Sequence, residues 1–255
     1  MRIAIAPTQA EGTAIAARVL MERFEQGKAL GVATGSTPLG LYDKLREAHA
    51  AGEFTLAGSS AYALDEYIGI DADHPQRYRN VLAAELVGED KTGLKDDDLH
   101  TPDGLADSPA QAAADYEQAI APGVDLQILG IGSDGHIGFN EPGGSLASRT
   151  HIGVLTEQTR TDNARFFDND IDKVPTHCLT QGLATIMSAK KILLLAFGEK
   201  KAEAMKQVIE GAVSAFWPGT ILQHHPDVTI VLDEAAAAQL QLADYYKTIW
   251  ESWNK

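Results

Sequence analysis

Short apolar runs alternate with longer amphipathic stretches along this chain of 255 residues. The apolar runs predict strands, because four to six consecutive aliphatic residues suit a strand that is buried on both faces. The stretches between them repeat apolar residues every three or four positions, which predicts helices. We expect strands at 3–6, 30–33, 61–64, 124–129, 192–197 and 228–232, and helices at 9–26, 37–51, 76–86, 109–120 and 200–210.

Strands that are separated by helices are typical of parallel βαβ units. We therefore expect an α/β fold of the Rossmann-like type, with a doubly wound, mostly parallel sheet and helices on both faces. Neither a linker rich in Pro or Ser, nor a shift in composition, nor an internal repeat divides the chain. The sequence thus predicts a single domain over residues 1–255.

Residues 149–180 interrupt the pattern, with many polar residues and only weak strand signals. Such a stretch is usually a surface excursion without a function. It can also be a lid over the crevice at the strand ends, where open α/β sheets bind ligands. The cation and two aromatic rings at Arg165, Phe166 and Phe167 favour a lid.

The chain is acidic, with a formal charge of -15 from 21 Lys and Arg against 36 Asp and Glu. This charge disfavours binding to nucleic acid or to an anionic membrane, and no basic stripe compensates for it. The longest apolar run, residues 192–197, is far too short to span a bilayer, and the N-terminus lacks a signal-peptide pattern. We expect a cytoplasmic protein that holds any anionic ligand with helix N-termini, glycine amides and a few local cations.

The most informative segment, GIGSDGHIGFNEP at 130–142, follows the apolar run at 124–129. It places Asp134, His136 and Glu141 among glycines where a strand opens into a loop. Two carboxylates and an imidazole with little surrounding bulk suit proton transfer on a small ligand. A polar turn that faces water is the alternative. The spacing matches no H-E-x-x-H pattern, so we expect neither a metal nor a cofactor.

Two further strand ends carry candidate residues. Gly35, Ser36 and Thr37 follow the strand at 30–33 and open a helix, where free amides and two hydroxyls could hold an anion. No Gly-Lys-Ser/Thr follows, so a nucleoside triphosphate is not indicated, and simple helix capping is the alternative. Asp65 directly follows the strand at 61–64. It could be a turn cap, or it could act as a general base at the ligand crevice.

With these loops identified, the chain resembles the glucosamine-6-phosphate deaminases, which are also called isomerases. The resemblance covers nearly the full length, and GHIGFNEP together with DEY is quite specific. The related sugar-phosphate lactonases share the fold and phosphate loop, but the chain resembles them less. The matching segments, in the family's order, are TGSTPLGLY (34–42), LDEYIG (64–69), HPQRYR (74–79), GIGSDGHIGFNEPG (130–143), SLASRT (145–150), RFFDND (165–170) and LQHHPD (222–227).

The resemblance implies conversion of glucosamine 6-phosphate and water to fructose 6-phosphate and ammonia, in amino-sugar catabolism. It implies that His136 moves the proton that opens the pyranose ring, oriented and charge-balanced by Asp134 and Glu141. It also implies that Asp65 transfers a proton from C2 to C1. The phosphate would be held by Gly35, Ser36, Thr37, Arg165 and Lys201.

The chain departs from the hexameric, allosterically activated members of this family. Those members carry polar or basic effector-binding side chains where this chain has Gly144, His151, Gly153 and Val154. We therefore expect an enzyme that is not activated by N-acetylglucosamine 6-phosphate, and a monomer or low-order homo-oligomer. A lactonase or an isomerase that releases no ammonia is the main alternative, and a non-catalytic sugar-phosphate sensor is a second one.

Overall fold

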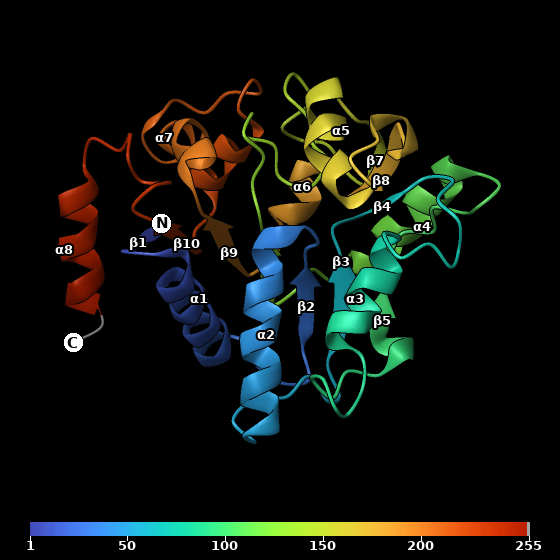
Figure 1. The fold of residues 1–255 in the computed structure, drawn as a ribbon, viewed down its shortest axis with the longest axis horizontal. Helices are drawn as coiled ribbons and strands as arrows, with labels where there is room; N and C mark the ends of the chain where they lie inside the picture. Colours follow the sequence, from blue (N-terminus) through green and yellow to red (C-terminus); the bar gives the residue numbers. More distant parts are fainter. Residues whose placement is uncertain (254–255) are drawn as a thin grey trace.

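A seven-stranded parallel sheet forms the centre of the computed structural model, which describes residues 1–253 (Figure 1). All six strands expected from the sequence are present within a few residues of the predicted ends, and every neighbouring pair runs parallel. The strand order is β1 (Arg2–Ala6), β10 (Val228–Asp233), β9 (Lys191–Ala196), β6 (Leu126–Leu129), β2 (Ala29–Val32), β3 (Ser60–Ala63) and β5 (Leu99–His100).

Helices cover both faces of this sheet. The helices α1 (Gln9–Arg23), α2 (Ser36–Ala50) and α3 (Tyr78–Leu86) lie in front of it in Figure 1. The connections through α4 (Pro109–Ile120) and α6 (Leu183–Ile186) cross the sheet in the opposite direction, and right-handed crossovers place them behind it. The predicted doubly wound α/β fold is thus confirmed. Within residues 1–253, no helix has the length and apolar character needed to cross a bilayer.

Side chains cap the first turns of two of these helices. The Thr8 hydroxyl accepts a hydrogen bond from the Glu11 amide at the start of α1, and Ser108 accepts one from Gln111 at the start of α4. Two C-terminal helices complete the fold. α7 (Ala202–Glu210) follows β9, and α8 (Ala243–Trp253) packs along the edge strand β1.

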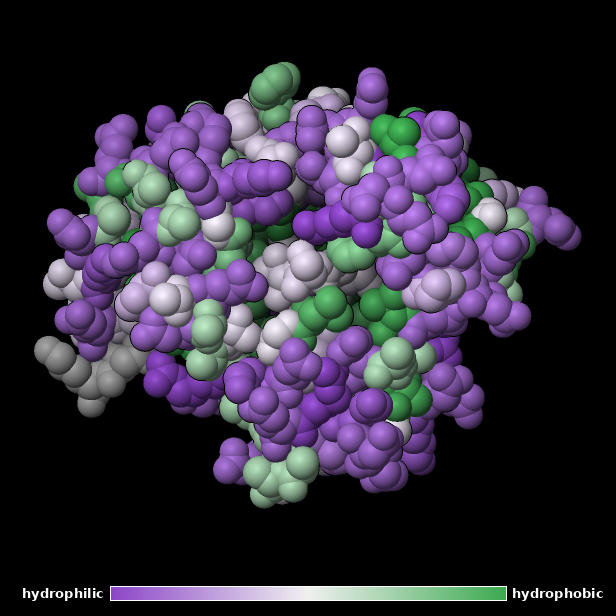
Figure 2. All heavy atoms as spheres, in the orientation of Figure 1, coloured by the Kyte–Doolittle hydropathy of each residue, from purple (hydrophilic) through white to green (hydrophobic). Residues whose placement is uncertain are grey.

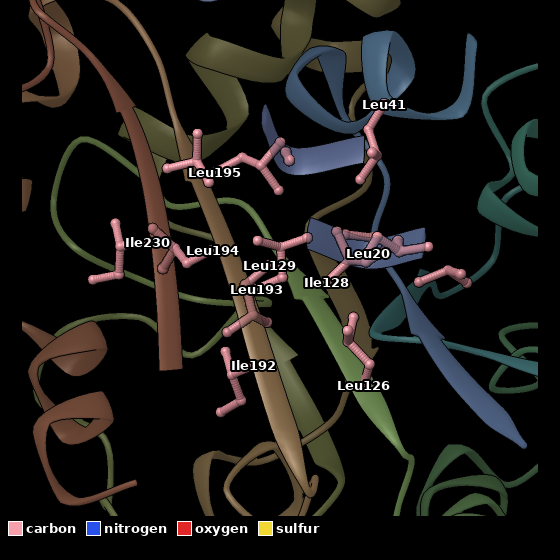
Figure 3. Packing of buried hydrophobic residues seen from close by; sticks show 14 of the residues in the cluster. Leu20, Leu41, Leu126, Ile128, Leu129, Ile192, Leu193, Leu194, Leu195 and Ile230 are labelled. Carbon is pink, nitrogen blue, oxygen red and sulfur yellow. The ribbon is translucent and has the colours of Figure 1, made fainter. Parts of the chain in front are cut away.

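Aliphatic side chains of the central strands form the core (Figure 3). Leu126 and Ile128 of β6, Leu194 of β9 and Leu20 of α1 are almost completely buried and belong to the same hydrophobic cluster. Each such side chain contributes about 1.5–3 kcal/mol to stability through burial. The continuous apolar runs seen in the sequence arise because helices cover these strands on both sides.

A second, antiparallel sheet lies at the carboxyl end of the first. It contains β4 (Asp65–Tyr67), β8 (His177–Thr180) and β7 (His151–Val154), and the sequence pattern did not predict it. Residues 149–180, the stretch expected above to be a lid, are called the lid segment below. They form β7 and β8, and between these strands lie α5 (Glu157–Asn163) and two short 3₁₀ turns, Ala164–Phe166 and Ile171–Lys173. Both ends of this segment are therefore fixed in a sheet.

The central sheet changes its winding direction between β2 and β6. The chain proceeds outward from β2 to β3 and β5 on one side, and from β6 to β9 and β10 on the other. Loops that leave such neighbouring strands separate, and a crevice opens at their carboxyl ends. Figure 2 shows a recess near the centre of the molecule in the same view, where apolar and weakly polar residues are surrounded by hydrophilic ones.

Candidate active site

A cavity of about 820 Å³ occupies this crevice. Its walls come from the loops after β2, β3, β6 and β9, from α3 and from the lid segment. This volume accommodates a small ligand such as a sugar phosphate. Seven of the nine site residues expected from the sequence line the cavity: Gly35, Ser36, Thr37, Asp65, His136, Arg165 and Lys201. The other two, Asp134 and Glu141, lie against the His136 imidazole.

The N-terminus of α2 forms one end of the cavity. Gly35 precedes the helix with a φ of 92°, a conformation that favours glycine, and no side chain caps the first amides. The Tyr42 hydroxyl fixes the preceding strand end, since it accepts a hydrogen bond from the Ala33 amide and donates one to the Ala33 carbonyl. Free amides and the positive end of a helix dipole make this turn an anion-binding site.

Two cations approach this turn from other elements. Arg165 extends from the lid segment, and its Nη2 donates a hydrogen bond to the Ser36 hydroxyl at 3.2 Å. Lys201 lines the cavity from the loop after β9 and is half-buried, and burial lowers the pKa of its amine. An anion at the helix start would thus gain positive charge from both sides despite the acidity of the protein.

The loop after β6 folds back on itself to present His136. The Gly132 amide donates to the His136 carbonyl at 2.9 Å, and the His136 amide donates to the Asp134 carboxylate at 3.2 Å. The imidazole lies against the backbone of Gly132, where a Cβ atom would come within 2.5 Å of the ring. Glycine at this position therefore makes room for the histidine, which explains the sequence pattern.

Two carboxylates flank the imidazole. The Nδ1 atom of His136 lies 2.8 Å from Oδ1 of Asp134 and 3.4 Å from Oε2 of Glu141. Burial by itself would lower the pKa of His136, but the two carboxylates outweigh it and raise that pKa to about 9. Burial would raise the pKa of Asp134, but His136 outweighs this effect and holds it well below the usual range. At neutral pH the imidazole is protonated.

Glu141 also contacts the lid segment. Its Oε1 accepts a hydrogen bond from the Thr159 hydroxyl of α5 at 2.6 Å and one from the Thr156 amide at 3.3 Å. The same carboxylate therefore lies between the imidazole and the first turn of the lid helix. A movement of that helix would change the surroundings of His136.

Asp65 approaches the cavity from the junction between β3 and β4. It pairs with Thr180 of β8, whose hydroxyl accepts a hydrogen bond from the Phe139 amide at 3.0 Å, so the loop after β6 is tied to the same place. Burial raises the pKa of Asp65, the adjacent Glu66 raises it further and His136 lowers it in part, and the resulting pKa is about 8. A carboxylate with this pKa can accept and return a proton near neutrality.

Asp134, His136 and Glu141 offer ligand atoms that all lie within 4.8 Å of one another. This spacing would also allow a cation to bind, and the expectation that no metal takes part stays a prediction. The close fit between an imidazole and two carboxylates is equally typical of an oriented proton-transfer group.

Sequence reasoning did not single out two residues of this region. Tyr78 lines the cavity from the first turn of α3, and the fully buried Glu66 accepts hydrogen bonds from the start of that helix. A tyrosine at a helix start and an acid next to another acid are common patterns, so neither gave a distinct signal.

Comparisons with known proteins show the family to which the chain belongs. The family model described as glucosamine-6-phosphate isomerases/6-phosphogluconolactonase matches residues 6–231. A glucosamine-6-phosphate deaminase from Beutenbergia cavernae is 57% identical over 97% of this chain and 95% of its own length. A second, from Mycolicibacterium smegmatis, is 56% identical over 88% of this chain and 85% of its own.

Solved structures of this family have the same fold. A monomeric glucosamine-6-phosphate deaminase superimposes with a TM-score of 0.89 at 39% identity, over 94% of this chain and all of that one. The 6-phosphogluconolactonase from Trypanosoma cruzi superimposes with a TM-score of 0.76 at 21% identity, over 94% and 97% of the two chains, which shows a shared fold. The chain belongs to the glucosamine-6-phosphate isomerase/6-phosphogluconolactonase family.

Proposed function

We propose that this protein is a glucosamine-6-phosphate deaminase, which converts glucosamine 6-phosphate and water to fructose 6-phosphate and ammonia. One observation carries this proposal: a single cavity combines an anion-binding helix start with a protonated imidazole and a carboxylate of pKa about 8. The close similarity over nearly full length to proteins of that activity supports it.

The phosphate binds at the start of α2. The amides of Gly35, Ser36 and Thr37 donate to its oxygens, and Arg165 and Lys201 balance its charge. With the phosphate fixed there, the sugar extends across the cavity toward the loop after β6 and the end of β3. This places its ring near His136 and its C1 and C2 atoms near Asp65.

Ring opening requires a proton to move from the C1 hydroxyl to the ring oxygen. His136 is protonated at rest, so it gives its proton to the ring oxygen as the bond from C1 to that oxygen breaks. It regains a proton from the C1 hydroxyl, which becomes the aldehyde. Asp134 and Glu141 hold the imidazole in place and stabilise its positive charge.

Isomerisation then requires a proton to move between neighbouring carbons. Asp65 in its ionised form removes the proton from C2 while protonated His136 gives a proton to the C1 oxygen, which yields an enolamine with a C1 hydroxyl. Asp65 then returns its proton to C1. The C2 nitrogen is then an iminium group. Water adds to C2 and displaces ammonia, which leaves the ketone of fructose 6-phosphate, and the proton that is released restores protonated His136. The lid segment excludes other water during the proton transfer.

The decisive experiment measures ammonia release from glucosamine 6-phosphate by the purified protein, with and without a chelator. We expect release in both conditions. A chelator that abolishes the activity would reveal a metal, and hydrolysis of 6-phosphogluconolactone without ammonia release from the amino sugar would establish the lactonase alternative. Absence of turnover with tight sugar-phosphate binding would instead indicate a sensor.

We further infer that the protein acts as a monomer in the cytoplasm. The solved deaminase that it resembles at 39% identity is itself monomeric. A charged hexose phosphate does not cross a membrane unaided, so an enzyme that consumes it belongs where the substrate is made. Mass measurement in solution, by light scattering, tests the oligomeric state.

A further inference from the structure

Glu66 is completely buried beside the proposed catalytic base, yet the reaction described above does not use it. Its carboxylate accepts three backbone hydrogen bonds: Oε1 from the amides of Tyr67 at 2.9 Å and Tyr78 at 3.0 Å, and Oε2 from the amide of Arg79 at 2.9 Å. The Nε atom of Arg77 lies 3.9 Å from Oε2. Burial raises the pKa of Glu66, while the three amides and Arg77 oppose this rise because they favour the ionised form.

Two of these bonds cap helix α3 from outside the helix. The residue before it, Arg77, makes no side-chain capping bond, and the first turn contains no acidic residue. The first amides of a helix need an acceptor, and anions there are favoured by the helix dipole. Glu66 of β4 provides both, so it determines where α3 begins relative to the strand that carries Asp65.

The residue placed by this cap is Tyr78, which lines the cavity. Its ring stacks on Phe139 with an interplanar angle of 17°, and its hydroxyl donates to the Tyr67 hydroxyl at 3.0 Å. The Tyr67 hydroxyl also accepts from Nδ2 of Asn163 in the lid helix at 3.0 Å. A continuous set of contacts thus joins the Glu66 carboxylate to the cavity wall and to the lid segment.

We propose that Glu66 is a positioning residue for the deamination. Its carboxylate anchors the first turn of α3, holds Tyr78 in the cavity wall and places a second carboxyl group directly beside Asp65. This inference rests on the proposed function, because it assigns Glu66 to the reaction carried out at that site. Neither oxygen of Glu66 reaches the cavity, so the residue acts through its neighbours.

The electrostatic surroundings of Asp65 agree with this role. Burial is the main cause of the raised pKa of Asp65, and the charge of Glu66 is the second. The other groups that interact with Asp65 are neutral near pH 7, with the exception of protonated His136, which lowers the pKa. The titratable groups around Asp65 are Glu66 and Tyr67 on β4, Tyr78 on α3, Tyr116 on α4, Cys178 on β8 and His136.

Three variants test whether Glu66 positions the site for the reaction or only stabilises the fold. E66Q removes the charge and keeps one acceptor oxygen, and E66D keeps the charge but shortens the reach to α3. The matched control is D125N, because Asp125 is also a buried carboxylate but lies at the opposite end of the sheet, where it binds Lys191 at 3.1 Å. For each full-length variant, kcat and KM for ammonia release are measured across pH 6–10, together with thermal unfolding.

We expect E66Q to lower kcat about ten- to a hundredfold while KM changes little, since small displacements of a cavity wall cost rates of this size. Its acid limb moves to lower pH, because Asp65 then loses its proton more easily. E66D lowers kcat and leaves the acid limb in place. D125N keeps wild-type kcat and pH profile even where its melting temperature falls.

A measurement without substrate completes the test. The carboxyl carbons of labelled aspartate are titrated by NMR in wild type and E66Q, with D65N used to identify the Asp65 signal. A lower pKa of Asp65 in E66Q supports the proposal, and an unchanged pKa with wild-type kcat overturns it. A wild-type protein that releases no ammonia would overturn the proposed reaction alone, since the titration reports on Glu66 independently.

Discussion

Replacing Asp65 by Asn should abolish deamination and at the same time stabilise the folded protein at alkaline pH. Asn cannot accept the C2 proton, so turnover is lost while the phosphate site stays intact. Ionised Asp65 is costly to bury, which is the reason for its raised pKa. The neutral amide of Asn avoids this cost. Function and stability should therefore change in opposite directions.

The size of the effect follows from the folded pKa of about 8 against the ordinary value of 3.8. Between these values the folded state keeps a proton that the unfolded state has released, so wild-type stability falls as pH rises. Each unit of difference corresponds to about 1.36 kcal/mol. The advantage of D65N over wild type should thus grow by roughly 3.5 kcal/mol between pH 5 and pH 8 and level off above pH 8.

Urea unfolding of wild type and D65N at pH 5 and pH 8 measures this difference directly. All other titrating groups are shared by the two proteins, so their effects largely cancel in the comparison. In thermal unfolding, the advantage of D65N in melting temperature should be about 7–14 °C larger at pH 8 than at pH 5. An advantage that is equal at the two pH values would show that Asp65 is already ionised at pH 5, and would refute its assignment as a base poised near neutrality.

Four other outcomes test the rest of the site. His136→Asn should slow ammonia release by about 10²–10⁴-fold with substrate binding retained, as titration calorimetry with an inactive variant can check. Arg165→Ala should mainly raise KM, and an unchanged KM would remove Arg165 from the phosphate site. The kcat/KM of wild type should rise with pH through the Asp65 pKa of about 8 and fall above the His136 pKa of about 9, as ammonia release measured at a series of pH values can check. Substrate saturation should be hyperbolic and insensitive to added N-acetylglucosamine 6-phosphate, whereas sigmoidal kinetics relieved by it would contradict the expected lack of an effector site.

The central sheet could be predicted from the sequence because its strands are buried on both faces. Burial on both sides leaves continuous aliphatic runs such as Ile192 to Ala196, and such runs are visible without a structure. The small antiparallel sheet gave no such signal. Its strands are three or four residues long, and β7 exposes Ile152 and Val154 to solvent, so no run or alternation of useful length exists.

The candidate site was predictable where its residues follow strand ends, and unpredictable where they act through another element. Asp65 stands directly after an apolar run and His136 stands in the loop that follows another, so the edge of a parallel sheet brings them together. Arg165 was recognisable only as a cation in an unusual segment. Glu66 could not be assigned, because its role depends on the amides of a helix that starts twelve positions later in the chain.

The arrangement of charge in the cavity explains how one site can both give and accept protons near neutral pH. Asp65 lies in apolar surroundings next to another acid, and its carboxyl holds a proton far above the ordinary range. Asp134 lies against an imidazole, and its carboxyl stays ionised far below that range, while it keeps His136 protonated. Pairs of groups whose surroundings move their pKa values apart are the means by which enzymes divide acid and base roles. The two aspartates are chemically identical, so this division arises from their positions: burial, reinforced by the neighbouring Glu66, raises the pKa of Asp65, whereas the adjacent imidazole outweighs burial at Asp134. Removing the charge of Glu66, as in E66Q, should therefore shift the pH dependence of kcat while KM for the substrate changes little.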